Sequence, residues 1–422
     1  MRLLVVTQYF WPETFRINDL VAELSSRGHE VTVLTGKPNY PDGQLLPDFA
    51  EAPQRYATYE GATIVRLPML ARGKGRLRLL LNYASFALSG LLLAPFKLRG
   101  RPFDAIFVCQ LSPVSSALPA VLMRRLRRIP STMWVLDLWP QSLVAVGVTR
   151  SAGLLGAVDW LVRFIYQRTD LLLGQSHAFV TDITARVGDP GRVAYLPGWS
   201  EPTEPLGTEV LAAEVPSRQD MFTIVFTGNV GEAQDFPALL DAMEALRGEA
   251  VRLIVVGSGR KGDWVRDEIA RRELSEKVSF VGRFPPERMP EFYRHADALL
   301  VSLRSEPSFA MTIPAKIQAY LSAGRPILAM LDGEGAEVVA AAGAGLAVSA
   351  GDVAGLTAAV RQMMAMSPVE REAMGRNGTL YADLEFNREK VISRLEEMLS
   401  NLVEKGTSSS AQESRDPTGR IF

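Results

Sequence analysis

The sequence predicts two doubly wound α/β domains joined by a short linker. Apolar runs of strand length alternate with helix-length segments over residues 3–196, and a second alternation covers residues 222–348. Residues 198–219, rich in Pro, Glu, Thr and Ser, separate the two series. Parallel strands require a crossover, so repeated βα units form parallel sheets covered by helices on both faces. A chain of 422 residues is also too long for one ordinary core.

The first domain begins with a β-α-β unit. Leu3–Thr7 is a short apolar strand, Arg16–Arg27 places its apolar residues on one helical face, Gly28 ends that helix, and Glu30–Thr35 is the next strand. Later elements are expected at Thr63–Leu67, Ala105–Cys109, Val114–Arg127, Ser131–Asp137, Leu171–Gly174 and Val193–Leu196.

The second domain restarts the alternation. Its strands are expected at Phe222–Thr227, Val251–Val256, Val278–Val281, Ala298–Ser302, Pro326–Leu331 and Leu346–Val348. The last helical pattern is Arg388–Val403, and the residues after it are low in apolar content. We therefore expect domains over 1–200 and 220–385, a linker over 201–219, a C-terminal helix over 386–405 and a disordered tail over 406–422. Two such domains predict a cleft between them.

Residues 313–337 are the stretch most typical of a ligand site. They predict a helix with Pro314 in its first turn, an exit at Gly324, a buried strand and a second helix. Lys316 would lie in the first turn of the first helix, with Glu334 and Glu337 facing it across the next loop. In parallel sheets ligands bind beyond the carboxyl ends of the strands, and one cation with two carboxylates suits a nucleotide sugar. The alternative is that all three side chains are simply solvated.

Composition excludes several classes of site. Residues 1–200 carry 22 Lys and Arg against 14 Asp and Glu, net +8, whereas residues 201–422 carry 24 against 33, net −9. The single cysteine, Cys109, excludes an internal disulfide and a cysteine-based zinc site, and the three histidines are widely scattered, so no metal site is expected. We see no signal peptide pattern and expect a cytoplasmic protein.

A basic and apolar stretch in the first domain indicates contact with a membrane. No acidic residue occurs between Glu60 and Asp104, and the apolar run LLLNYASFALSGLLLAPF has basic residues on both sides. A helix lying on an anionic membrane surface, a helix packed in the domain and a true span all remain open. Nucleic acid is not expected, because no recognition motif accompanies the charges. The candidate membrane-contact residues are Arg72, Lys74, Arg76, Arg78, Arg99 and Arg101.

A glycine-rich turn follows the strand Val251–Val256. Gly257, Gly259 and Gly262 form a G-x-G-x-x-G pattern, but the next strand ends without the acidic residue that a dinucleotide site needs. A tight βα turn, or Arg260 and Lys261 facing phosphate, suits this pattern better than NAD(P). No cofactor is expected.

Carboxylates supply the candidate catalytic groups of the first domain. Asp137 ends a buried strand beside an aromatic residue, where it could orient or deprotonate an acceptor hydroxyl, or cap a helix. Glu13, Arg16 and Asn18 follow the first strand and could reach the same cleft, or be solvated. Cys109 is interpreted as a core residue.

Taken together, these motifs resemble glycosyltransferase family 4, which has the GT-B fold. The resemblance covers the chain to about Val403 and rests on the phrases QYFWPETFRINDLVAELSSRGHEVTVLTGKPNYPDG, WVLDLWPQSL, FTGNVGEAQDFPALLDA, VVGSG and PAKIQAYLSAGRPIL. They are similar to phrases of bacterial transferases that add N-acetyl-L-fucosamine or a related 6-deoxy amino sugar in O-antigen or capsule synthesis.

The resemblance implies a UDP-sugar donor held mainly by the second domain, retention of configuration, and an undecaprenyl-diphosphate-linked saccharide as acceptor. This chain departs from the family pattern at several positions. Asn229 and Gln234 stand where an Arg and a Lys usually grip the diphosphate, and Met311 and Ala319 stand where two glutamates are usual. Leu136 replaces a common histidine, and residues 13–16 replace a Gly-rich loop.

Because of these departures, we assign the contacts with the sugar donor to other residues than those of the family pattern. The diphosphate is assigned to Lys316, Arg260 and Lys261, with Asn229 and Gln234 donating hydrogen bonds and Glu334 and Glu337 binding hydroxyls. Arg16 and Asn18 are assigned to an acceptor or phosphate loop. The predicted function is that of a retaining glycosyltransferase at the cytoplasmic face of the inner membrane, without need of a metal. A non-catalytic UDP-sugar or lipid-binding partner and a nucleotide-sugar epimerase are the alternatives.

Overall fold

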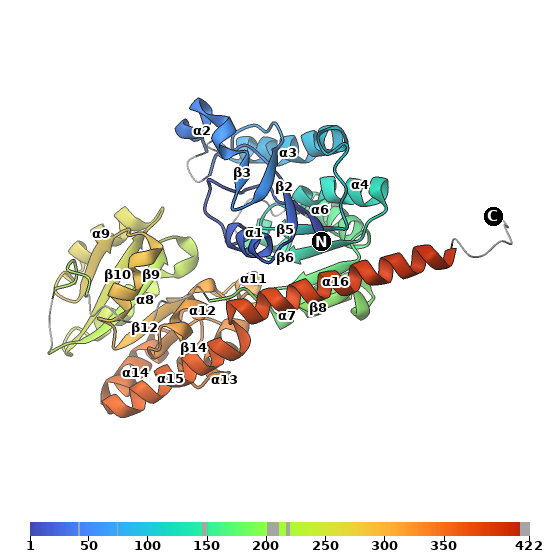
Figure 1. Cartoon of the computed structure of the whole chain (residues 1–422). Coiled ribbons are helices and arrows are strands. Elements are labelled where there is room, and N and C mark those ends of the chain that lie inside the picture. The colour runs from blue at the N-terminus through green and yellow to red at the C-terminus, as the bar shows by residue number, and fades with distance from the viewer. Residues whose placement is uncertain are drawn as a thin grey trace. The chain divides into compact units, whose positions relative to one another are not determined.

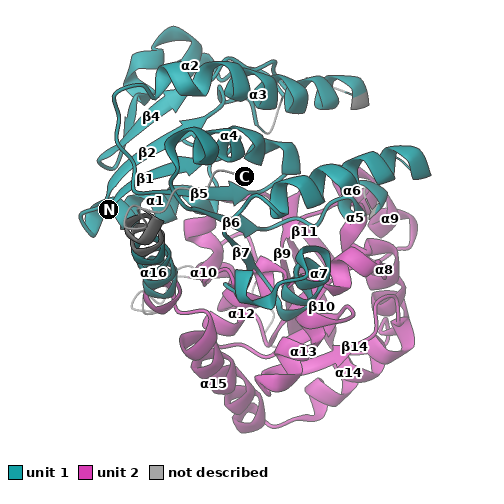
Figure 2. Ribbon diagram, turned by 90° about the vertical axis from the view of Figure 1, so that its right-hand side faces the viewer, with its two compact units in different colours: residues 1–196, 392–422 teal, residues 197–391 magenta. Residues whose placement is uncertain are grey.

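The computed structural model confirms two doubly wound α/β units (Figure 1). It describes residues 1–40, 43–73, 75–145, 149, 151–200, 211–216 and 220–413, without the side chains of residues 76, 145 and 406–413. Most of the predicted linker, the predicted contact Lys74, the side chain of Arg76 and residues 414–422 of the predicted tail therefore lie outside the described part. Unit 1 comprises 1–196 and 392–422, and unit 2 comprises 197–391 (Figure 2).

Unit 1 contains an eight-stranded sheet in the order β3-β4-β2-β1-β5-β6-β7-β8. All neighbours are parallel except the short outer pair β3 and β4. The strands are β1 (Arg2–Val6), β2 (Glu30–Thr35), β3 (Thr58–Tyr59), β4 (Ala62–Arg66), β5 (Ala105–Gln110), β6 (Ser131–Val135), β7 (Leu171–Gly174) and β8 (Val193–Tyr195). β5 and β6 are buried along their whole length, and β1 is buried except at Arg2, as strands covered on both faces must be.

The helices of unit 1 alternate with its strands, and two regions differ from the expectation: residues 37–59, expected to be a loop, contain the short elements α2 (Pro47–Glu51), η1 (Pro53–Tyr56) and β3, and the helix after β5 is divided. The helix expected over 114–127 is divided into a 3₁₀ turn, η2 (Val114–Ala117), and α4 (Leu118–Arg127), whose second residue is Pro119. The others are α1 (Arg16–Ser26), α3 (Arg76–Lys97), α5 (Gln141–Ala145), α6 (Ala152–Tyr166), α7 (His177–Val187) and η3 (Pro190–Arg192).

Unit 2 contains a wholly parallel six-stranded sheet in the order β11-β10-β9-β12-β13-β14. Its strands are β9 (Phe222–Asn229), β10 (Val251–Ser258), β11 (Val278–Gly282), β12 (Ala298–Ser302), β13 (Ile327–Met330) and β14 (Gly345–Val348). Successive side chains point to opposite faces, so Phe226 joins the core on one face and Val225 the core on the other.

Helices cover both faces of the unit 2 sheet. The core containing Phe226 is closed by α8 (Phe236–Ala245), α9 (Gly262–Arg271) and α14 (Val353–Ala365). The other core is closed by α10 (Met289–Tyr293), α12 (Ala315–Ser322), α13 (Glu334–Ala341) and α15 (Pro368–Glu385). The short elements are η4 (Glu232–Gln234), η5 (Pro286–Arg288) and α11 (Pro307–Ala310).

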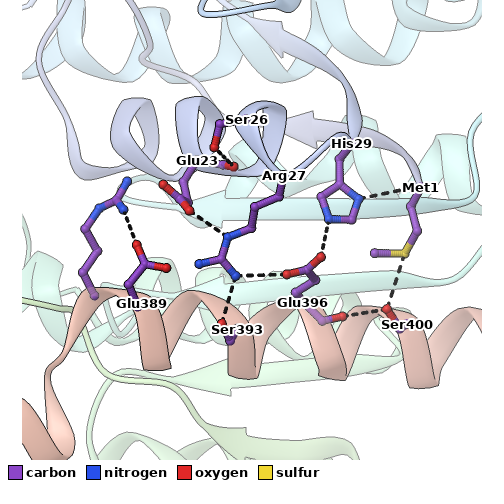
Figure 3. Close-up of polar contacts among 10 residues, drawn as sticks. Met1, Glu23, Ser26, Arg27, His29, Glu389, Ser393, Glu396 and Ser400 are labelled. Atoms are coloured by element: carbon purple, nitrogen blue, oxygen red, sulfur yellow. Dashed lines mark hydrogen bonds and ion pairs between the residues drawn. The ribbon is translucent and has the colours of Figure 1, made fainter.

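The last helix, α16 (Arg388–Glu413), is longer than predicted and returns to unit 1 from Ile392 onward. Arg27 and His29, at the end of α1, both bind the carboxylate of Glu396, at 3.1 and 2.8 Å (Figure 3). Arg27 also donates to the hydroxyl of Ser393 at 2.9 Å. These contacts attach the C-terminal helix to the first β-α-β unit of the chain.

Candidate active site

The carboxyl ends of β9 and β10 pack closely enough to require glycine. Gly228 has φ +112°, in the region that favours glycine. A Cβ atom on Gly257 would lie 1.8 Å from the carbonyl oxygen of Gly228, and one on Gly259 would lie 2.2 Å from that of Val230. The amide of Lys261 donates to the same Val230 carbonyl at 3.0 Å. The glycine pattern is thus a tight βα turn packed on the end of β9.

Lys316 points from the first turn of α12 to the same edge. Its Nζ lies 3.6 Å from the ring centre of Phe226, and a Cβ on Gly228 would lie 2.8 Å from its Cε. This Nζ is buried and has no hydrogen-bond partner in the described chain. Burial lowers the pKa of Lys316 to about 7. A buried ammonium without an anion is costly, so this position favours an anionic ligand.

Tyr320, one turn further along α12, holds this helix against β9. Its hydroxyl accepts a hydrogen bond from the amide of Thr227 at 2.9 Å and lies 3.1 Å from the hydroxyl of that residue. The contact fixes the register of α12 next to the strand end. It therefore sets the place from which Lys316 reaches Gly228.

Asn229 and Gln234, which the sequence assigned to the diphosphate, lie together. The Asn229 amide donates to Gln234 Oε1 at 3.3 Å, and the backbone amide of Gly231 donates to the same oxygen at 3.0 Å. Asn229 is exposed at the end of β9. The pair shapes the loop beside Lys316 and leaves the Asn229 side chain accessible to a ligand.

Arg260 and Lys261 differ in whether an acidic side chain already pairs with them. Lys261 forms an ion pair with Glu232 at 3.0 Å, and its Nζ lies 5.1 Å from the ring centre of Trp264. Arg260 is exposed. A phosphate would have to compete with Glu232 for Lys261, so the assignment to the diphosphate is better met by Lys316.

Glu334 and Glu337 both lie in the first turn of α13, as predicted. Glu334 is 9% exposed, whereas Glu337 is exposed. A Cβ on Gly335 would lie 3.0 Å from Ile317 Cδ1 and 3.1 Å from Pro314 Cδ. The starts of α12 and α13 therefore pack together beyond the ends of the strands. Pro314 itself precedes α12 as its capping residue, and Gly324 takes the predicted left-handed exit at φ +65°.

Asp137 is the best-positioned carboxylate of unit 1. It follows β6 by two residues, and it accepts hydrogen bonds from the indole of Trp139 at 3.0 Å and from the hydroxyl of Ser142. Burial raises its pKa, and its hydrogen bonds with Ser142, Trp139 and Ser112 oppose the change. The ring of Tyr83, from α3, lies 6.2 Å from that of Trp139. A half-buried, oriented carboxylate of this kind suits a group that binds or deprotonates a hydroxyl.

Glu13 has a different position from the one predicted. It is 4% exposed, and its carboxylate accepts backbone hydrogen bonds from Asn39 and Tyr40 at 2.7 Å each and from Phe10 at 3.2 Å. Burial raises its pKa, whereas those donors and the charge of Arg66 oppose the change. Both oxygens are used to hold two loops together. The geometry gives Glu13 a structural role and does not support the catalytic role predicted for it.

Arg16 and Asn18 begin α1, after the first loop. The Asn18 amide donates to the carbonyl of Glu13 at 2.7 Å, and its Oδ1 is buried without a partner in the described chain. Arg16 is half-buried. Neither residue is placed by this structure against a ligand, so the acceptor-loop assignment stays a prediction.

Two buried glutamines were missed by the sequence reasoning. Gln8 lies two residues after β1, and Gln110 is the last residue of the neighbouring parallel strand β5, so each is two residues beyond the pair formed by Val6 and Val108. Gln110 is fully buried, and neither polar atom of its amide has a partner in the described chain; the same is true of Gln8 Oε1. The signal was present, because each stands at the end of an apolar run, as Asp137 does. The amide of Gln110 and the Oε1 of Gln8 add unpaired polar atoms to this end of the sheet, whereas Gln8 Nε2 donates to Asn82 Oδ1 at 2.8 Å.

The basic and apolar stretch forms α3, whose polar stripe faces inward. Asn82 is fully buried and donates to the carbonyl of Leu70 at 2.6 Å, and Ser85 accepts from the amide of Leu70 at 3.0 Å. The outer side of the helix is apolar, with Leu88 58% and Phe96 75% exposed. Its 21 residues Leu77–Lys97 are long and apolar enough to cross a membrane by length and composition, with 28% of the apolar window buried.

Known glycosyltransferases match both halves of the chain. Residues 14–199 match the Glycosyl transferase 4-like domain, and residues 221–366 match Glycosyl transferases group 1.

No group of three or more His, Cys, Asp or Glu side chains in the described chain is placed to hold a metal ion.

Two curated relatives and one solved structure are similar along much of the chain. The probable glycosyltransferase WbjE of Pseudomonas aeruginosa is 26% identical over 54% of this chain and 58% of its own length. The putative colanic acid biosynthesis glycosyl transferase WcaI of Escherichia coli K12 is 24% identical over 77% of this chain and 82% of its own length. The chain thus spans little more than half of WbjE.

The fold itself has solved counterparts. Anabaena Alr3699/HepE, in complex with UDP and glucose, superposes with a TM-score of 0.65 at 15% identity, over 95% of this chain and 99% of its own. The two domain matches and the two observed sheets lead to one conclusion. The chain has the GT-B fold, and its two halves match a glycosyltransferase 4-like domain and, after it, a group 1 domain.

Proposed function

We propose that this protein transfers a sugar from a UDP-sugar to a lipid-linked saccharide in bacterial surface polysaccharide synthesis. The observation that carries the proposal is Lys316, a buried ammonium without a hydrogen-bond partner at the ligand-binding edge of a doubly wound sheet. A diphosphate is the anion that a glycosyltransferase must hold and release. HepE, which shares the fold, was solved with UDP, and WcaI is named for colanic acid biosynthesis; both agree with this choice.

In the proposed reaction unit 2 binds the donor. Lys316 and the exposed Asn229 contact the diphosphate, and Glu334 and Glu337 bind hydroxyl groups. As the bond from the anomeric carbon to the diphosphate oxygen breaks, negative charge grows on the leaving group. A cation already in place there stabilises the transition state more than the ground state.

Unit 1 binds the acceptor in this proposal. Asp137, oriented by Trp139 and Ser142, accepts a hydrogen bond from the attacking hydroxyl and favours loss of its proton. The resemblance to retaining enzymes supports attack on the face from which the diphosphate leaves, with an N-acetylated 6-deoxy amino sugar as the donor sugar. The outward-facing leucines of α3, with Arg78, Arg99 and Arg101 nearby in sequence, suit a protein held on the cytoplasmic face of the inner membrane.

The test is UDP release by the purified protein. A panel of UDP-N-acetyl amino sugars is supplied with and without a polyprenyl-diphosphate saccharide in detergent, with Lys316→Met as the inactive control. Release that requires one donor together with the acceptor supports the proposal and identifies the sugar.

Saturable UDP-sugar binding without release from any pair would reject the transferase proposal for those substrates. It would favour the alternative of a non-catalytic UDP-sugar-binding partner. Donor conversion in the absence of any acceptor would instead favour the epimerase.

A further inference from the structure

The N-terminal half of α6 is an apolar helix end that no other described part of unit 1 covers. Residues 152–158 read AGLLGAV and contain no charged or hydrogen-bonding side chain. Five of these seven residues are exposed, and Leu154 is 47% exposed. A Cβ atom added at Gly153 or Gly156 would meet nothing within 4 Å. We call residues 152–158 the α6 tip.

The other half of α6 anchors the tip firmly. Val162, Ile165 and Tyr166 are at most 1% exposed. Asp159, at the boundary between the halves, forms ion pairs with Arg163 at 2.7 Å and Arg186 at 2.6 Å. The tip therefore extends from a fixed base, and its exposure is a property of the folded unit.

Helices α6 and α3 pack against the same element of unit 1. Both helices pack on η2. Arg186, which binds Asp159 of α6, also donates to the carbonyl of Trp139 at 3.3 Å, and the Trp139 ring contacts Tyr83 of α3. The outward side of α3 is apolar as well, with Leu77 72% and Leu81 42% exposed. Both helices belong to unit 1 (Figure 2).

The distribution of apolar residues around the tip discriminates between possible occupants. A protein partner covers one face of a helix and leaves a polar face to water. The α6 tip has no polar face, so a lipid layer, which surrounds an inserted element with apolar groups, covers it more completely than a partner that binds one face. Trp160, 66% exposed, and Arg168, whose guanidinium lies 3.9 Å from the ring centre of Phe164, follow the apolar end. An apolar end followed by tryptophan and arginine, with the one acidic residue between them, Asp159, paired to two arginines, is typical of an element that enters a lipid surface.

We infer that the α6 tip inserts into an anionic lipid surface as a second membrane contact beside α3. Seven residues of helix span about 10 Å, which is the depth that interfacial elements reach. Asp137 is linked to both helices through Trp139. The Trp139 indole donates to Asp137, its ring contacts Tyr83 of α3, and its carbonyl accepts from Arg186, which binds Asp159 of α6. The inference rests on the proposed function for the lipid-linked acceptor, whose diphosphate would then lie at the lipid surface near Asp137.

The experiment measures binding of the full chain to vesicles of phosphatidylethanolamine and phosphatidylglycerol by flotation. Leu154→Glu is the test variant and Leu88→Glu tests α3. The matched control is Leu380→Glu, because Leu380 is 70% exposed on α15 of unit 2. We expect Leu154→Glu to weaken vesicle binding about tenfold or more, since a charge in the apolar layer is costly. Leu380→Glu should bind as the wild type does, and all three variants should keep the wild-type melting temperature.

A second readout locates the tip directly. Brominated lipid should quench part of the tryptophan fluorescence of the wild type, and Trp160→Phe should remove that part. The inference is overturned if Leu154→Glu binds as the wild type while Leu88→Glu does not, because α3 alone then makes the contact. It is also overturned if Leu154→Glu changes only the oligomeric state, which would identify a second copy of the chain as the occupant. Vesicle binding does not depend on turnover, so failure of the UDP-release test leaves this result unaffected.

Discussion

The ammonium of Lys316 lies 3.6 Å from the ring centre of Phe226, where it is buried and has no hydrogen-bond partner in the described chain. The aromatic ring offsets part of the desolvation cost. Burial nevertheless lowers the pKa of this lysine to about 7, far below its ordinary value. At neutral pH Lys316 is therefore only partly protonated without a ligand, and a bound anion favours its protonated, charged form.

Binding of UDP should take up protons above pH 7. In the free protein Lys316 is largely neutral at about pH 8, and a diphosphate beside it favours the charged form. We expect uptake approaching one proton per site, measured by calorimetry in two buffers of different ionisation enthalpy. Lys316→Met should remove the uptake, whereas Lys261→Met should keep it, because Lys261 is already paired with Glu232. Equal uptake by the wild type and Lys316→Met would contradict the assignment.

The same substitution should stabilise the protein. The native pKa of about 7 lies below the unfolded value, so the unfolded chain binds more protons between about pH 7 and 10. Wild-type stability should therefore rise with pH across that window. Lys316→Met should lose this slope and gain about 1 kcal/mol or more at pH 7. Urea unfolding at several pH values measures both effects, and a pH dependence unchanged by the substitution would reject a buried lysine.

Asp137→Asn should lower turnover about 100-fold or more with little change in UDP-sugar affinity, because its role is toward the acceptor. Ser142→Ala provides the finer test. The Ser142 hydroxyl lowers the Asp137 pKa, so its loss should raise that pKa further. The acid limb of the pH-rate profile should then move to higher pH. A shift in the opposite direction would show that another group controls that limb.

Glu13→Gln should act on stability and leave chemistry almost intact. The amide keeps one acceptor oxygen but loses the charge that three backbone N–H groups bind. We expect a loss of about 1–3 kcal/mol in the free energy of unfolding. Turnover per folded molecule should stay within a few-fold of the wild type. A hundredfold loss of turnover at unchanged melting temperature would restore the catalytic role that the structure does not support.

Gln110→Met should raise the free energy of unfolding by about 1 kcal/mol, because it removes a buried amide without partners. The matched control is Gln175→Met, since the Gln175 amide donates to the carbonyl of Leu136 at 2.9 Å. That variant should be destabilised. Thermal unfolding compares them, and a destabilised Gln110→Met would show that the amide has a partner in the protein, such as a bound water.

The sequence by itself determined the two parallel sheets and the carboxyl ends of their strands as the edges where a ligand site is expected, whereas the order of the strands within each sheet came from the structure. Apolar runs of strand length, repeated with helix-length segments between them, leave few other ways to bury both faces. Lys316 and Asp137 were proposed from their place beside buried strands, whereas Asn229 was proposed only from the resemblance to the family. This reasoning needs only local pattern and strand direction, both of which the chain order specifies.

Only the tertiary structure decided what each candidate side chain contacts. Glu13 is covered because residues 39 and 40, more than twenty positions later, return their amides to it. The polar stripe of α3 faces inward because Leu70 meets Asn82 and Ser85 there, which leaves the leucines outside. Lys261 and Lys316 look alike in sequence, yet one meets Glu232 and the other only an aromatic ring. Burial and charge depend on contacts between distant segments, and those contacts exist only in the folded chain.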